Sequence, residues 1–175
     1  MNYDEQVAHH EAAHVVLSRH NGGGPSDVGI DLNRPSSVED AFGSAGVKLL
    51  AHDPSQPEDV QMLDLIRNLS TILAGAASDA LILGWSQEEA LTRQPGDVGY
   101  ARELIERSPL FASAAPGAVA AFSQKLIDRG FEAAQQLLTQ ANIWKRVESI
   151  AIATLANGGE LSQLEIENLL TLAED

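Results

Sequence analysis

The stretch HHEAAHVVLSRH, residues 9–20, lies within the segment that decides the fold. Helix-forming residues run through it from Tyr3, and NGGGP at residues 21–25 then supplies the glycines and the proline that end a helix. We therefore predict one helix over residues 3–20. This stretch places four histidines and a glutamate in twelve positions, so the helix is also a candidate for metal binding.

His10, Glu11 and His14 form the pattern His-Glu-x-x-His. Side chains four residues apart lie on one face of a helix, so both imidazoles can reach one ion while the glutamate hydrogen-bonds a water beside it. Zinc held by three protein ligands keeps a position for water, lowers the pKa of that water to about 7 and polarises a peptide carbonyl. The alternative is a solvated helix face without a metal, because so short a pattern also occurs by chance.

A zinc site of this kind needs a third ligand, and His20 is one candidate. Leu17 stands where the extended histidine motif of the metzincin proteases has the glycine that turns the chain back. If the helix continues, His20 lies about 9 Å along the axis from His14. A positive charge on His20 would then be stabilised by the C-terminus of the helix, and His20 would not be a metal ligand.

Two aspartates are the other candidates. Asp79 interrupts an apolar run, so its carboxylate needs a partner: a metal ion, a ligand imidazole, the backbone or a cation. Asp97 follows a turn and precedes a helical pattern, which by itself predicts a helix N-cap. The spacing of residues leaves the choice among His20, Asp79 and Asp97 open.

The rest of the chain predicts a mainly α protein with a small β-hairpin after the first helix. DVGIDL at 27–32 and AGVKLL at 45–50 fit two short antiparallel strands. A long helix over 57–83, loosened at Gly75, should follow. Ser-x-x-Glu capping boxes predict helix starts after Ser55, Ser86 and Ser162. The remaining helices are expected over 97–107, 118–129, 142–156 and 162–172, with 131–140 also helix-prone.

Composition narrows the class of protein. The 175 residues are 44% hydrophobic and 21% charged, as in globular proteins with one core. The net charge of −14, with no basic block, argues against nucleic acid or an anionic membrane as partner. Without cysteine, a metal site must use histidine and carboxylate. The acidic N-terminus carries no leader and the apolar run 69–83 is shorter than a membrane span, so we expect a cytoplasmic protein.

Several separated stretches resemble the peptidase domain of the FtsH-type ATP-dependent zinc proteases. HEAAHVVL, residues 10–17, is similar to the first-helix motif HEAGHAVV of that family. LAGAASDALILG at 73–84 and GDVGYARELI at 96–105 are similar to two later blocks, and residues 149–170 are similar to the C-terminal helices. The resemblance implies a helical metallopeptidase domain.

The same resemblance implies the roles of the site residues. His10, His14 and Asp97 would be the zinc ligands and Glu11 the general base. Asp79 would support a ligand without binding the metal. The chain departs from the family in having TRQPG, residues 92–96, where the family has a Thr-Gly-Ala sequence before the aspartate. The implied domain spans 1–175, with a zinc-site half at 1–110 and a C-terminal helical half at 111–175.

The implied activity is hydrolysis of peptide bonds. The 175 residues contain no Gly-x-x-x-x-Gly-Lys-Ser/Thr phosphate loop and no anchor-like span, so we expect a stand-alone peptidase-like protein. Such a site would act on peptides or unfolded segments, unless a separate ATPase partner delivers other substrates. The ring assembly of the family implies a homo-oligomer. The alternative is a non-catalytic metal-binding or interaction protein that retains the peptidase fold.

Overall fold

A computed structural model describes residues 1–23, 28–35 and 42–172. Within these ranges the chain forms eight α-helices, a 3-10 turn and one small antiparallel sheet, which confirms the mainly α class. The elements are α1 (Tyr3–His20), β1 (Ile30–Pro35), β2 (Phe42–Ala45), α2 (Glu58–Ile72), α3 (Ala74–Leu83), α4 (Gln87–Arg93), α5 (Pro95–Arg107), η1 (Pro109–Phe111), α6 (Pro116–Leu138), α7 (Ala141–Ala156), β3 (Glu160–Leu161) and α8 (Gln163–Leu172).

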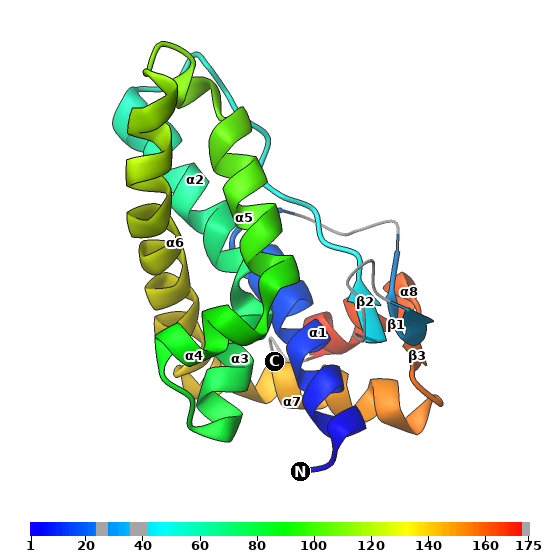
Figure 1. Ribbon diagram of the computed structural model, residues 1–175. Helices are drawn as coiled ribbons and strands as arrows, with labels where there is room; N and C mark the ends of the chain where they lie inside the picture. Colours follow the sequence, from blue (N-terminus) through cyan, green and yellow to red (C-terminus); the bar gives the residue numbers. More distant parts are fainter. Residues whose placement is uncertain (24–27, 36–41, 173–175) are drawn as a thin grey trace.

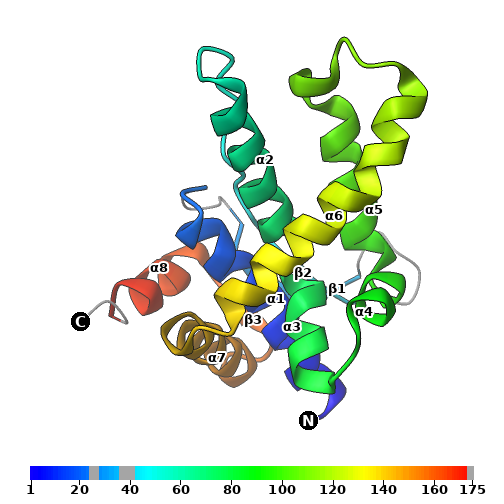
Figure 2. The same cartoon turned by 90° about the vertical axis from the view of Figure 1, so that its left-hand side faces the viewer.

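Helix α1 runs through the middle of the molecule (Figures 1 and 2) and packs mainly against α7 and α3. It has the predicted bounds, and Gly22 follows it with a φ of 87° that favours glycine. Most of its last three turns is buried, and Glu11 and His14 are only 7% and 9% exposed. The helix face that carries Glu11 and His14 is therefore buried and not solvated.

The sheet has the strand order β2-β1-β3. The predicted pairing of two strands after α1 is confirmed, with Ile30 opposite Ala45 in the antiparallel β1–β2 pair. A third strand joins from the far end of the chain, because Leu161 of β3 pairs with Ile30 on the other side of β1. The first residue of the predicted strand 27–32 lies outside the described residues.

The second strand lies at 42–45, whereas the sequence predicted it at 45–50. Beyond Gly46, whose N–H still bonds the carbonyl of Gly29, the backbone of the predicted segment is hydrogen-bonded to side chains instead of a neighbouring strand. Ser18 Oγ bonds both the N–H and the C=O of Lys48, and the Asn68 amide bonds both groups of Leu50. These bonds satisfy the backbone without a sheet, so the β-compatible sequence stays irregular.

The predicted helix 57–83 is two helices, α2 and α3, bent by 52°. The break falls at Leu73, two residues before the predicted loosening at Gly75. At the break the carbonyl of Thr71 accepts a hydrogen bond at 2.9 Å from Nδ1 of His14 in α1. A side chain that takes a carbonyl out of the helical ladder is a known cause of a bend.

The predicted capping boxes differ in outcome. Ser86 accepts from Glu89 N–H, and Ser162 and Glu165 bond each other's backbone, as predicted. The box at Ser55 is wrong, because Pro57 precedes the first residue of α2 and the Ser55 hydroxyl bonds Asp53 instead. Ser55 thus belongs to a local turn, in which its N–H and its hydroxyl both donate to the Asp53 carboxylate, and it does not cap α2.

The predicted segments 118–129 and 131–140 form one continuous helix, α6. Gly130 lies between them, where α6 meets α2: a Cβ there would stand 2.6 Å from Cβ of Leu69. Figure 2 shows α2, α5 and α6 extending to one side of the molecule, with α7 and α8 at the other. The buried core includes apolar side chains of both predicted halves, such as Leu69 and Ile150. The assignment of one domain over 1–175 stays a prediction.

Of the helices in the described ranges, none is by itself long and apolar enough to cross a membrane. The pair α2 and α3 passes the same length and composition criteria only when taken together, across its 52° bend.

Candidate metal centre

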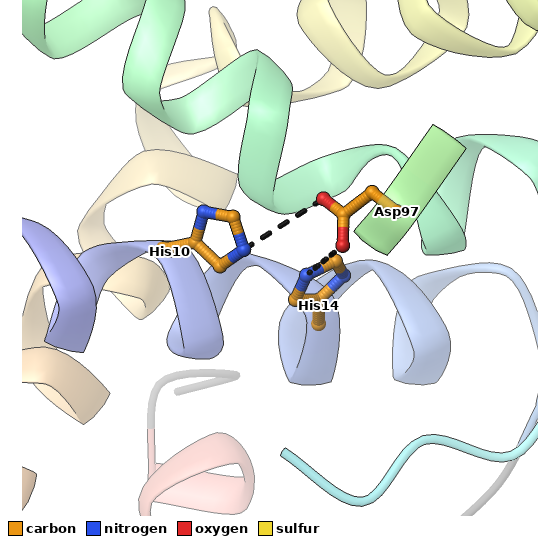
Figure 3. A group of neighbouring side chains, drawn as sticks. All are labelled: His10, His14 and Asp97. Atoms are coloured by element: carbon orange, nitrogen blue, oxygen red, sulfur yellow. Dashed lines mark ion pairs between the residues drawn. The ribbon is translucent and has the colours of Figure 1, made fainter. Parts of the chain in front are cut away.

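Three side chains from two helices converge on one point (Figure 3). His10 and His14 project from successive turns of α1, and Asp97 reaches them from the first turn of α5. Asp97 Oδ2 lies 3.7 Å from His10 Nε2, and Asp97 Oδ1 lies 3.6 Å from His14 Nε2. One ligand atom from each residue can be chosen so that all three lie within 4.8 Å of one another. Ligands of a tetrahedral zinc ion stand about 3.3 Å apart, so these separations are close to those of a zinc site.

Hydrogen bonds from the other ring nitrogens orient both imidazoles. His10 Nδ1 donates to Asp79 Oδ2 at 3.0 Å, and His14 Nδ1 donates to the carbonyl of Thr71 at 2.9 Å. Because a carboxylate and a carbonyl only accept, each ring has a proton on Nδ1 there, so Nε2 is the nitrogen that would bind a metal, in place of any proton it carries in the metal-free protein. A carboxylate or carbonyl behind a metal-binding histidine is the usual arrangement in zinc proteins.

Asp97 is the third residue of α5, so the predicted N-cap role is wrong. Gln94 occupies the N-cap position and Pro95 the first helical position, where a missing N–H costs nothing. The Asp97 carboxylate therefore points at the two histidines. Its Oδ2 is buried and has no hydrogen-bond partner among the described residues, as expected of an oxygen meant for a cation.

Glu11 follows His10 on α1 and is 7% exposed. No other described residue forms a hydrogen bond with its carboxylate. Burial raises the pKa of Glu11, although the nearby charges of His10 and His14 oppose that shift. A buried carboxylate with a raised pKa beside a candidate metal site is suited to taking up and releasing a proton.

The charge around His10 also fits a cation. Burial lowers the pKa of His10, but the hydrogen bond to Asp79 and the charges of Asp97, Asp79 and Glu11 outweigh it and raise the pKa to about 10. The carboxylates of the site thus favour a positive charge at this ring. Two imidazoles and one carboxylate are also a donor set that catalytic zinc takes, so the residues fit zinc.

Gly75 in α3 provides the space for the His10 ring. A Cβ at this position would stand 2.3 Å from His10 Nε2 and 2.4 Å from its Cε1. Any larger residue would therefore displace the ring. The sequence suggested that Gly75 loosens a helix, whereas the structure places it inside α3 against a candidate ligand.

The remaining candidates have other positions. Asp79 is fully buried in α3, where it bonds Nδ1 of His10 on the side of the ring away from Asp97. His20 is the exposed last residue of α1, which continues through Leu17 as expected. Sequence reasoning missed Thr71 and Gln94, because a backbone carbonyl and a glutamine before a proline carry no metal-site signal.

No family model matches this sequence, and no curated protein matches it.

Proposed function

We propose that this protein is a zinc-dependent metallopeptidase that hydrolyses peptide bonds in peptides or unfolded segments. The observation that carries the proposal is the convergence of His10, His14 and Asp97 from two helices, with both Nε2 atoms directed at the same carboxylate. The resemblance to FtsH-type peptidase domains supports the same ligand set. In addition, both Nδ1 atoms donate hydrogen bonds, to Asp79 and to the carbonyl of Thr71. Simple ion pairing of the two histidines with Asp97 would not require these bonds.

Each residue has a role in the proposed reaction. Zinc, when bound, would supply a Lewis acid that polarises the peptide carbonyl and makes water more acidic. His10, His14 and Asp97 would hold it. Glu11 would accept a proton from the attacking water at its carboxylate and deliver that proton to the departing amide nitrogen. Asp79 would keep the His10 ring in the orientation that presents Nε2.

The proposed setting follows from the family resemblance. We propose a cytoplasmic protein that acts on flexible chains, alone or with a separate ATPase that delivers unfolded substrate. Self-association, as in the rings of the FtsH-type proteases, is part of the same proposal.

The test combines metal content with cleavage. Purified protein should bind one zinc per chain and cleave casein or an unstructured peptide. Glu11→Gln should keep the zinc and lose at least about 100-fold in rate, because only the proton acceptor is removed. The control is Glu106→Gln in α5, an exposed glutamate, which should cleave like the wild type. Cleavage that survives Glu11→Gln would reject the assignment.

The second candidate is a metal-binding or interaction protein without peptidase activity. The side chains of His10, His14 and Asp97 are only 14%, 11% and 16% exposed, which restricts the approach of a substrate backbone. If this candidate is right, the protein binds zinc in a one-to-one ratio but cleaves no unstructured chain. Glu11→Gln then changes neither the zinc content nor the absence of cleavage.

A further inference from the structure

Gln94 joins three elements around the candidate metal centre. Its backbone N–H bonds the carbonyl of Ala90 at 3.1 Å and so closes α4, while its own carbonyl accepts from Val98 N–H at 3.2 Å and so opens α5. Its side chain takes no part in capping either helix. Instead Nε2 donates to Asp79 Oδ2 in α3 at 2.5 Å. The junction between α4 and α5 is therefore tied to α3 by the Gln94 side chain.

The oxygen that Gln94 contacts is the one that orients His10. Asp79 Oδ2 accepts from Gln94 Nε2 on one side and from His10 Nδ1 on the other. Asp79 is fully buried, and its second oxygen has no hydrogen-bond partner within the described ranges. Among the residues described, two donors thus hold this carboxylate, and the removal of one leaves His10 bonded to a less constrained partner.

The same contact connects the two helices that carry the candidate ligands. α1 packs mainly on α7 and α3, whereas α5 packs mainly on α2 and α6, so their relative position depends on intermediates. Two successive hydrogen bonds link His10 to Asp79 and Asp79 to Gln94, which lies three residues before Asp97. Because Asp97 lies in the first turn of α5, movement of Gln94 moves the carboxylate relative to both imidazoles.

We propose that Gln94 is a positioning residue of the metal centre, which sets the place of Asp97 relative to His10 through Asp79. This inference rests on the proposed metal site and adds a residue to it. Gln94 belongs to TRQPG, the segment in which the chain departs from the FtsH-type pattern. The departure is thus a different way of fixing the third ligand, not the loss of one.

The test is Gln94→Met, which keeps the length of the side chain and removes its donor. The matched control is Gln140→Met, because Gln140 is also a helix N-cap whose side chain makes no capping bond. Zinc affinity is measured by competition with a chromogenic chelator, and ligand geometry by the visible absorption of the cobalt-substituted protein. Gln94→Met should bind zinc about 10-fold to 100-fold more weakly and change the cobalt spectrum, while Gln140→Met changes neither.

A thermodynamic cycle separates positioning from a general structural role. In an Asp79→Ala background, Gln94→Met should weaken zinc binding no further, because the link is already broken. If Asp79→Ala does not fold, the cobalt spectrum of Gln94→Met alone decides. Because Gln94→Met removes a donor from the buried Asp79 carboxylate, the metal-free variant should melt at a lower temperature, and zinc affinity is compared at a temperature where both proteins are folded.

Three outcomes are distinguishable. Wild-type zinc affinity and cobalt spectrum in Gln94→Met would overturn the inference and leave the metal site standing. A lower melting temperature with unchanged zinc affinity would show a structural role only and would equally overturn it. Failure of the wild-type protein to bind zinc would remove both the inference and the proposed function.

Discussion

Replacing Gly75 by alanine perturbs the candidate metal centre without changing any ligand. The new Cβ would stand 2.3 Å from His10 Nε2, whereas ordinary contact begins at 3.4 Å, so the ring must move by about 1.1 Å (3.4 − 2.3). Zinc–ligand distances tolerate deviations of only about 0.2 Å. His10 therefore cannot keep its position as a ligand, and zinc affinity should fall by about 100-fold or more.

The same substitution should not unfold the protein. Alanine inside a helix is favoured over glycine by about 0.5–1 kcal/mol, and the clash is with a side chain that can rotate away. Zinc binding and stability should therefore respond in different ways. A loss of affinity caused by unfolding would instead appear as a lower melting temperature of the metal-free protein.

Zinc affinity is measured by chelator competition, with circular dichroism of the metal-free proteins to follow folding. Gly99→Ala is the control, because this glycine lies in α5 near Asp97 and an added Cβ meets nothing within 4 Å. A second control is Gly75→Ala in a His10→Ala background, where no ring remains to be displaced. In that background Gly75→Ala should lower zinc affinity no further. Zinc binding by Gly75→Ala with wild-type affinity would refute the reasoning about the His10 ring.

Three further predictions concern pH, metal and capping. The fold raises the pKa of His10 from 6.5 to about 10, so this group stabilises the metal-free protein fully below pH 6.5. That stabilisation should be lost as the pH rises through 10, and a melting temperature that does not change with pH over this range would contradict the prediction. Zinc at 100 times its Kd should stabilise the protein by about 2.7 kcal/mol in urea titrations, and chelator should reverse the gain. Ser162→Ala, which breaks the α8 capping box, should cost about 1 kcal/mol in urea without altering zinc affinity.

Local patterns predicted those parts of the fold that depend on neighbouring residues. The bounds of α1 and the start of α8 were predictable, because a glycine stop and a reciprocal Ser162–Glu165 cap act within a few residues. The strand expected at 45–50 was not, because Ser18 and Asn68 bond its backbone from distant helices. The break at Leu73 likewise depends on a histidine far away in the chain.

For the metal centre, the sequence by itself determined that His10 and His14 share one face of a helix with Glu11 next to them. Helical spacing is a local property, so it needs no knowledge of the fold. Only the tertiary structure decided that Asp97 faces the imidazoles instead of capping a helix, and that Asp79 and Thr71 fix which nitrogen of each ring is available. These arrangements join residues 57 to 87 positions apart, whose approach depends on how the helices pack and on no pattern within any one of them.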